Sequence, residues 1–350
     1  MRSAVLDIGS NSAQLQVVDV ASGAPPLPVH AVKEPTRLGE ELQADGSLSE
    51  RGAHRVAAAV RRTVEAAGRL EVELLYPFIT AAIRDATNRS DVLDLIEVES
   101  GIRPQYLSGE EEARLTYFAA HRWYGWSSGH LLLIDIGGGS MELALGRDVE
   151  PDLAVSLPLG AGRLTRSHLN GDPPGRSELK GLRQHVRDTL SEVLDRLRWE
   201  GNPRRVVGTS KTFKQLARVA GAAPRRRGPF VKRELSLADL RDQIPRLTDV
   251  NTRKRAELKG ISRPRAGQIV AGALTAEATM SALDVISVEI CPWALREGVL
   301  LHHLEAHSAT PELPLRALSR TAFASKGEKN DGVTARGTVT ALPARRGPPA

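Results

Sequence analysis

The sequence contains a single cysteine, which excludes an intramolecular disulfide. Cys291 lies in the apolar segment ISVEICPWAL, a setting that favours an inert core thiol over a nucleophile. Aromatic residues make up only 4% of the 350 residues, so the core must consist mainly of Leu, Val, Ile and Ala. No apolar run approaches the ~20 residues of a membrane span, and the first residues lack the apolar stretch of a signal peptide. We therefore expect a cytoplasmic protein without a membrane partner.

The chain carries a net charge of +6, which favours an anionic partner without distinguishing nucleic acid, phosphate esters and polyphosphate. Two segments are rich in cations. One is PRRRGPFVKR, residues 224–233, and the other is the stretch 308–350, where hydrophobic periodicity is lost and a disordered basic tail is predicted. Each is interpreted either as solvated chain or as a segment that holds a polyanion.

One short pattern occurs twice. LDIGSNSAQL at residues 6–15 and IDIGGGSMEL at residues 134–143 align at a constant offset of 128 positions, which places Asp7 on Asp135. Each copy consists of an apolar strand, a turn of small residues and a second strand, and so predicts a β-hairpin. A repeat of this kind predicts an α/β protein with two similar halves, each of which opens with a hairpin.

The two turns have the composition of phosphate sites. Glycine lets backbone N–H groups approach a ligand, successive N–H groups form a concave anion site, and serine hydroxyls add donors. The residues expected to bind phosphate are Gly9, Ser10, Asn11, Ser12, Gly137, Gly138, Gly139 and Ser140. An aspartate at a strand end would repel phosphate unless a cation or a water network lies between them. Asp7 and Asp135 therefore indicate Mg²⁺.

Three further polar residues are candidates for chemistry. Ser108, three residues before Glu111, predicts a helix that starts with a capping box, and Glu112 on that helix is a candidate base for activating water. In the alternative interpretation, the glutamates only complement the positive end of the helix. Glu142 beside the second turn would be costly unless it binds metal or positions water. Lys211 follows a predicted strand and opens a helix, where a cation can meet an anion.

The paired hairpins resemble the phosphate loops of the actin, sugar kinase and Hsp70 superfamily. More closely, the chain resembles the exopolyphosphatase and guanosine pentaphosphate phosphatase family, and most of all its short two-domain actinobacterial members. The motifs that carry the resemblance, over roughly residues 1–305, are LDIGSNS, TAAIRDATN, LSGEEEARL, IDIGGGSMEL, SLPLGAGRL, VGTSKTFKQLA, AGQIVAGAL and ICPWALREGVLL.

The resemblance implies an α/β fold with two actin-like (ribonuclease H-like) domains, whose mixed sheets flank an interdomain cleft. The first domain would comprise residues 1–124 plus about 293–307, and the second would comprise residues 125–292. It also implies a homodimer.

The family pattern also implies roles for single residues. Glu112 would be the catalytic base and Glu142 a second catalytic residue, while Arg84 in AAIRDA would reach the phosphate. The alternative for Arg84 is an ion pair with Asp85 or another acid. Asp7, Asp135 and Glu142 would be the ligands of Mg²⁺ or Mn²⁺.

The implied activity is that of an exopolyphosphatase, which releases terminal orthophosphate from linear inorganic polyphosphate by Mg²⁺-dependent attack of a water activated by Glu112. Hydrolysis of guanosine pentaphosphate (pppGpp), a stringent-response nucleotide, would use the same loops. Guanosine tetra- or pentaphosphate could also be a ligand or an inhibitor. The remaining alternatives are a non-catalytic sensor of polyphosphate or of these nucleotides, and an ATP-dependent sugar or acetate kinase.

Overall fold

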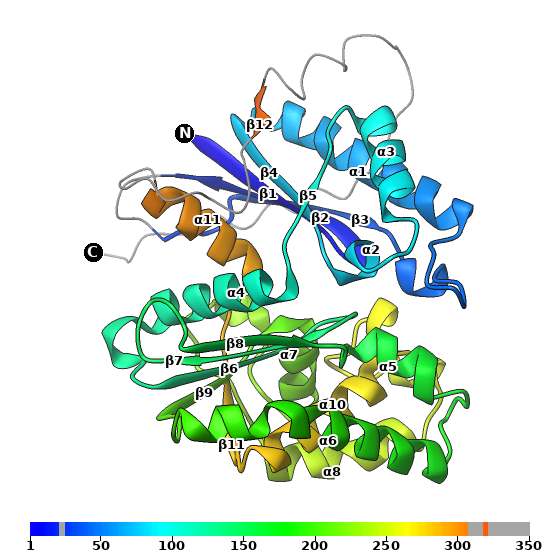
Figure 1. Ribbon diagram of the computed structural model, residues 1–350, viewed down its shortest axis with the longest axis vertical. Coiled ribbons are helices and arrows are strands. Elements are labelled where there is room, and N and C mark those ends of the chain that lie inside the picture. The colour runs from blue at the N-terminus through cyan, green and yellow to red at the C-terminus, as the bar shows by residue number, and fades with distance from the viewer. Residues whose placement is uncertain (21–24, 307–317, 321–350) are drawn as a thin grey trace. The chain divides into compact units, whose positions relative to one another are not determined.

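The computed structural model describes residues 1–20, 25–306 and 318–320. By their contacts, the described residues form two compact units, residues 1–107 with those from 299 onward and residues 108–298 (Figure 1). Each unit is built on one mixed sheet, which confirms the predicted α/β class. The domain boundaries and the cleft expected from the family stay predictions. Most of the predicted tail, 308–350, lies outside the described residues.

The first unit is built on a sheet whose strand order is β12-β4-β1-β2-β3, with β5 paired to β4. β1, β2 and β3 form an antiparallel meander, and β4 runs parallel to β1. The strands are β1 Arg2–Ile8, β2 Ser12–Asp19, β3 His30–Pro35, β4 Leu74–Ile79, β5 Gln105–Tyr106 and β12 Leu318–Ser319. β12 falls inside the predicted tail, where the sequence pattern predicted no strand.

Helices cover the first sheet. α1 (Glu50–Arg69) packs on β1, β2 and β3, and α3 (Arg89–Ser100) packs on α1. The apolar run ELLYPFITAAI, residues 73–83, predicts a buried strand from its sequence. This prediction is wrong at its end, because β4 stops at Ile79 and Ala81–Arg84 form the helical turn α2. The turn starts there because the Thr80 carbonyl accepts hydrogen bonds from the N–H groups of residues 83 and 84.

The second unit repeats this topology with a sheet of strand order β10-β11-β9-β6-β7-β8. β6, β7 and β8 form an antiparallel meander, and β9 runs parallel to β6, as β4 does to β1. The strands are β6 Leu131–Ile136, β7 Met141–Gly146, β8 Leu153–Leu157, β9 Arg205–Gly208, β10 Glu234–Ser236 and β11 Ser287–Ile290. The duplication predicted from two ten-residue segments therefore extends to at least four strands.

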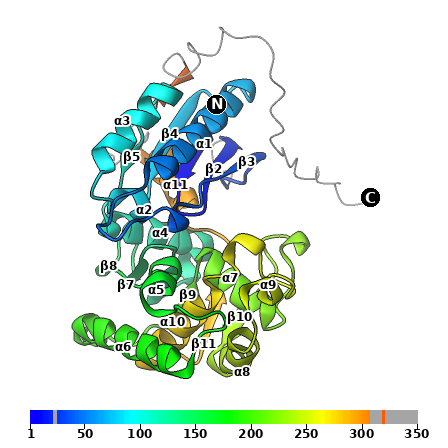
Figure 2. The same cartoon turned by 90° about the vertical axis from the view of Figure 1, so that its right-hand side faces the viewer.

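The second sheet has helices on both faces. α4 packs on β7 and β8, while α10 is buried on nearly every side among α5, α6, α7 and α8 (Figure 2). The helices of this unit are α4 Gly109–Tyr124, α5 Ala161–His168, α6 Arg176–Trp199, α7 Ser210–Val219, α8 Leu237–Thr248, α9 Thr252–Arg255 and α10 Ile269–Ala282. A further helix, α11 (Leu295–Ala306), starts in this unit, and its residues from 299 onward belong to the first unit. The sequence over residues 266–285 is apolar nearly all round, which predicts a buried helix, and apolar residues recur at helical spacing from Leu179 to Leu197, which predicts a long amphipathic helix. Helices α10 and α6 confirm these two predictions. Within the residues described, no helix is long and apolar enough to cross a membrane.

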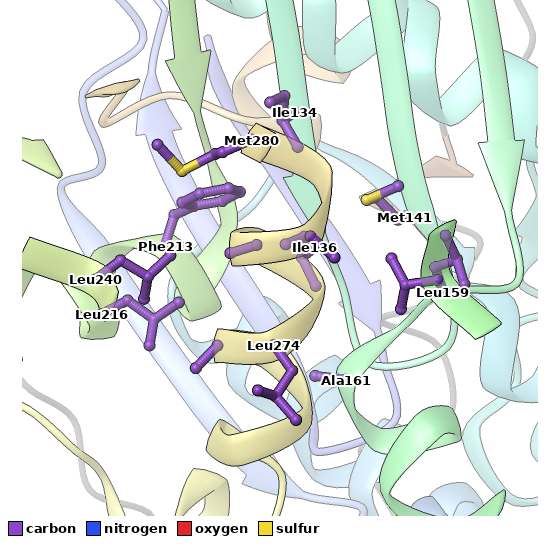
Figure 3. Close-up of a cluster of buried hydrophobic side chains, with 14 of the residues drawn as sticks. Ile134, Ile136, Met141, Leu159, Ala161, Phe213, Leu216, Leu240, Leu274 and Met280 are labelled. Carbon is purple, nitrogen blue, oxygen red and sulfur yellow. The ribbon is translucent and has the colours of Figure 1, made fainter. Parts of the chain in front are cut away.

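The core of the second unit is aliphatic, as the scarcity of aromatic residues requires. Figure 3 shows Ile134 and Ile136 of β6 beside α10, and Phe213 of α7 among side chains that include Leu216 and Leu240. These side chains are nearly inaccessible to solvent. The end of β6, from which the second hairpin turn starts, is thus anchored in the buried core of the unit.

Candidate functional site

Both predicted hairpins are present, and their turns close in the same way. The Gly9 N–H donates to the Ser12 carbonyl at 3.1 Å, and the Gly137 N–H donates to the Ser140 carbonyl at 2.9 Å. The two glycines are thus equivalent in structure as well as in sequence.

The second turn is held by the start of α5. The N–H groups of Ala161, Gly162 and Arg163 donate to the carbonyls of Gly137 and Gly138 at 2.9–3.0 Å. The Arg163 Nε atom donates to the next turn carbonyl, at residue 139, at 2.8 Å. The N–H groups of residues 138 and 139 donate to no acceptor in the described part of the chain. The carbonyls are therefore engaged while two amides are available to an anion.

The first turn is held in an analogous way by the residues that follow β3. The Thr36 hydroxyl donates to the Gly9 carbonyl at 2.7 Å, and the Leu38 N–H donates to the Ser10 carbonyl at 2.7 Å. The Thr36 N–H donates to the Asn11 carbonyl at 3.1 Å. We call these two supports, residues 36–38 and residues 160–163, the carbonyl clasps. The motif SLPLGAGRL contains the second clasp, but its contact with the turn was not predicted. The first clasp was not predicted at all.

A row of polar side chains crosses the second sheet beside its turn. Asp135 on β6 lies directly opposite Glu142 on β7, and Glu142 lies opposite Ser156 on β8. Opposed residues in antiparallel strands point to the same face, so these side chains are neighbours. The Ser156 hydroxyl donates to Glu142 Oε1 at 2.9 Å, and the Thr209 hydroxyl donates to Asp135 Oδ2 at 2.6 Å. Burial raises the pKa of the Asp135 carboxyl, and the Thr209 hydroxyl opposes this shift.

The equivalent row in the first sheet has a different charge. Asp7 lies opposite Gln14, and Gln14 lies opposite Lys33. One carboxylate and one ammonium group balance in this row, whereas the second row carries two carboxylates. A pair of carboxylates is a common protein contribution to a Mg²⁺ site, where water and substrate oxygens complete the shell. Asp135 and Glu142 therefore fit the predicted cation. No three His, Cys, Asp or Glu side chains gather as a metal cage in the part of the chain described.

Glu112 lies on the buried side of α4. The predicted capping box is confirmed, because the Ser108 side chain accepts from the Glu111 N–H and the Glu111 carboxylate accepts from the Ser108 N–H. Glu110 pairs with Arg114 at 2.8 Å. Glu112 is only 6% exposed, on a helix that packs on β7 and β8. Glu110 and Glu111 thus fit the alternative in which the glutamates only complement the positive end of the helix, whereas Glu112 is buried and is not part of a solvated helix start.

Arg84 ends α2 and is mostly buried. Its Nε atom pairs with Asp85 Oδ1 at 2.9 Å and its Nη1 atom donates to the Leu107 carbonyl at 3.2 Å, so the ion pair considered as an alternative is present. Contact of Arg84 with phosphate stays a prediction. Beside Arg84 lies a pocket of about 800 Å³. Its lining residues include Arg84, Arg89, Leu93, Arg103, Pro104 and Tyr106.

The start of α7 is attached to the end of β6. The Thr209 N–H donates to the Ile134 carbonyl at 3.0 Å, and the Thr212 hydroxyl donates to the Ile136 carbonyl at 2.7 Å. Ser210 between them has a φ of 65°, which is unusual for a residue with a side chain. Lys211 lies in the first turn of α7, as predicted. Thr209 and Ser210 were not predicted, although they belong to the quoted motif VGTSKTFKQLA.

The cation-rich segment 224–233 is organised around its last residue. The Arg233 guanidinium donates to four carbonyls of this segment and of Ala223, at 2.7–3.0 Å. This arginine therefore supports the loop itself. Residues 225–227 form a short 3₁₀ turn at the surface.

Two α/β units that each present a glycine turn with clasped carbonyls, with paired carboxylates beside one of them, define a phosphoryl-handling protein. Comparison with known proteins agrees with this class. Residues 16–307 match the Ppx/GppA phosphatase family, and the chain belongs to this family.

The chain is similar to mycobacterial relatives along most of its length. It is 47% identical to Exopolyphosphatase 1 of Mycobacterium tuberculosis over 308 residues, which cover 88% of this chain and 90% of that protein. Exopolyphosphatase 1 of Mycobacterium leprae is 46% identical, with 88% and 91% covered.

Solved structures show the same fold. An exopolyphosphatase from Cytophaga hutchinsonii superposes with a TM-score of 0.80 at 23% identity, over 87% of this chain and 98% of that one. The Ppx/GppA family member from Aquifex aeolicus gives a TM-score of 0.73 at 24% identity, with 89% and 99% covered. These likenesses confirm the predicted fold.

Proposed function

We propose that this protein is an exopolyphosphatase that releases terminal orthophosphate from linear inorganic polyphosphate. Membership of the Ppx/GppA family and similarity to proteins named Exopolyphosphatase 1 support this activity. The observation that carries the proposal is the combination, within the second unit, of a turn with two available amides and two nearly buried carboxylates, Glu112 and Glu142.

The chemistry follows from what hydrolysis of a phosphoanhydride requires. The oxygen of a water molecule attacks the terminal phosphorus, and the bond from phosphorus to the bridging oxygen breaks. Glu112 accepts the proton of that water, and the shortened polyphosphate leaves with the bridging oxygen. The amides of residues 138 and 139 bind the equatorial oxygens of the transferred group. Arg84 and Lys211 supply further positive charge to the phosphates.

A divalent cation, Mg²⁺ or Mn²⁺, completes the proposed site. Asp135 and Glu142 would hold it, since they form the doubly negative row, and Ser156 and Thr209 orient the two carboxylates by hydrogen bonds. The cation would neutralise negative charge on the substrate oxygens. Asp7 remains the third expected ligand.

A second candidate activity is hydrolysis of pppGpp, and one observation favours it. A nucleotide requires an aromatic or apolar wall for its base. The pocket beside Arg84 offers such walls in Leu93, Pro104 and Tyr106. The Arg89 guanidinium lies 4.7 Å from the centre of the Tyr106 ring, so this aromatic side chain is held in place by a cation.

Side-by-side turnover assays test these proposals. Orthophosphate release is measured from short polyphosphate, long polyphosphate and pppGpp with Mg²⁺, with Mn²⁺ and with a chelator. We expect polyphosphate to be hydrolysed and the chelator to abolish release. An ATP-dependent transfer to sugars or acetate without hydrolysis would instead indicate a kinase. Binding without any turnover would indicate a sensor, and light scattering tests the expected homodimer.

Glu112→Gln tests the base. We expect this variant to lose about 10²- to 10⁴-fold in kcat, the usual contribution of general base catalysis. Glu110→Gln is the matched control, because Glu110 is the exposed acid two residues earlier on the same helix. Equal rates for Glu112→Gln and the wild type would refute the assignment.

A further inference from the structure

Arg37 has a backbone conformation that its side chain disfavours. Its φ and ψ are 47° and 40°, in the left-handed region. Among the described residues only three other non-glycine residues have positive φ, namely Glu71, Ser210 and Asp284. Glu71 and Asp284 come just after helices α1 and α10, where a left-handed residue is an ordinary way to end a helix. Arg37 instead precedes the short 3₁₀ turn Leu38–Glu40, so helix termination does not account for it.

Arg37 belongs to the first carbonyl clasp. Its neighbours Thr36 and Leu38 hold the carbonyls of the first turn, and its own N–H lies 3.5 Å from the Asn11 carbonyl. The backbone of Arg37 is therefore in direct contact with the turn that is expected to bind phosphate.

The equivalent position in the second unit shows how closely this residue lies to the turn. Ala13 pairs with Glu34 in the first sheet, and the equivalent Met141 pairs with Leu157 in the second. Three residues further along, Arg37 corresponds to Gly160. A Cβ atom on Gly160 would lie 2.3 Å from the carbonyl carbon of residue 139. In the second unit, the residue at this position lies so close to the turn that there is no room for a side chain. The first unit has an arginine at the same position.

The Arg37 side chain is exposed and uncompensated. In the described part of the chain, its guanidinium pairs with no carboxylate and donates to no acceptor. Arg84, the other arginine of this unit that is expected to contact phosphate, differs in this respect, since it pairs with Asp85. A strained residue that carries an unpaired charge next to an anion-binding turn is the combination expected at a ligand contact. A guanidinium also matches two oxygens of a phosphate group at once.

We infer that Arg37 is a substrate-binding residue, which donates to a phosphate group of the polyanion seated on the first turn. The inference rests on the proposed function for the identity of the substrate, and it adds a phosphate ligand that the family motifs quoted above do not include. Arg37 holds the substrate in the ground state and in the transition state alike, so its loss raises KM more than it lowers kcat.

Arg37→Gly tests the inference, because relief of backbone strain should raise stability, whereas loss of the phosphate contact should weaken substrate binding. Glycine tolerates the left-handed backbone, so we expect the melting temperature to rise by about 3 °C. Loss of a charged hydrogen bond should raise the KM for polyphosphate about 10- to 100-fold, with kcat changed less than about 3-fold. Arg37→Lys should recover part of the affinity. Glu71→Gly is the matched control, since it also removes a left-handed side chain and should raise the melting temperature without changing KM.

A binding measurement separates this inference from the proposed activity. Tripolyphosphate is added to the full-length Glu112→Gln protein with and without Arg37→Gly, and the ligand-induced rise in melting temperature is recorded. We expect the rise to be largely lost with Arg37→Gly, and this result supports the inference even if turnover of polyphosphate is absent. An unchanged KM and an unchanged tripolyphosphate response would overturn it. A lower melting temperature for Arg37→Gly would also overturn it, because the side chain would then support the fold.

Discussion

Gly160→Ala tests whether the second carbonyl clasp positions the phosphate turn. A Cβ atom at this position would lie 2.3 Å from the carbonyl carbon of Gly139 and 2.4 Å from the backbone nitrogen of Ser140. Both contacts are with backbone atoms, which cannot move aside by a change of side-chain rotamer. The start of α5 and the turn must therefore move apart.

The free-energy cost of Gly160→Ala can be worked out from the hydrogen bonds that would break. Three N–H donors from residues 161–163 bind the turn carbonyls. At about 1 kcal/mol each, their loss amounts to ~3 kcal/mol, and the overpacking itself adds at least ~1 kcal/mol. A total of about 4 kcal/mol corresponds to a fall of roughly 10 °C in the melting temperature of the second unit. Since a shift of ~1 Å at a reacting centre can cost about 10²-fold, we expect kcat/KM to fall by about 100-fold.

Two further glycine variants serve as controls in thermal unfolding and phosphate-release assays. Gly162→Ala places its Cβ 3.0 Å from the Gly138 carbonyl oxygen, so its effects should be smaller. Gly181→Ala on α6 meets nothing within 4 Å and should raise stability by about 0.5–1 kcal/mol, because alanine is the better helix former. If Gly160→Ala melted and turned over like the wild type, the clasp would not be what positions the turn.

Three other predictions concern stability and reactivity. Hydrogen bonds from Ser49 and Arg51 lower the pKa of Glu41 from 4.5 to about 2, so this carboxylate stabilises the fold above pH 4.5 and loses that effect as the pH falls toward 2. The difference in melting temperature between the wild type and Glu41→Gln should accordingly shrink over this range, and a constant difference would contradict the assignment. Asp172→Ala should cost about 2 kcal/mol in urea unfolding, because the guanidinium of Arg255, whose side chain is 3% exposed, loses its carboxylate partner and keeps, among the described residues, only hydrogen bonds to the carbonyls of Val250 and Ala266. Burial raises the pKa of Cys291 to about 12, so iodoacetamide should label this thiol only after unfolding, and rapid labelling of the native protein would disprove its burial.

The hairpins could be predicted because each depends on about ten contiguous residues. Gly9 and Gly137 mark turns whose closing hydrogen bonds reach only three residues ahead. The capping box at Ser108 and the buried helix α10 are local features for the same reason. Fold class and family followed from these local patterns.

The carbonyl clasps could not be predicted, because they depend on contacts between distant residues. Thr36 binds the carbonyl of Gly9 across 27 positions, and Arg163 binds that of Gly139 across 24. The two clasps also share no sequence pattern, since one uses a threonine hydroxyl and the other an arginine side chain. The end of the strand predicted at residues 73–83 failed for a related reason. A short apolar run is compatible with a strand or with a helix. The end of β4 is set by its pairing with β1, where the Thr80 N–H donates to the Ile8 carbonyl.

The comparison of the two rows explains how one duplicated backbone can serve two purposes. Turn closure and clasped carbonyls are common to both units, and under the proposed function both turns bind phosphate. The side chains beside the turns have diverged, because Glu142 in the second row corresponds to Gln14 in the first, and Ser156 corresponds to Lys33. Two carboxylates in one row attract a cation more strongly than a row in which a lysine balances the single carboxylate of Asp7, so an arginine beside the first turn opposes metal binding less than one beside the second turn would. Under the proposed function, the second unit therefore performs the hydrolysis, and the first unit contributes mainly to holding the polyanion.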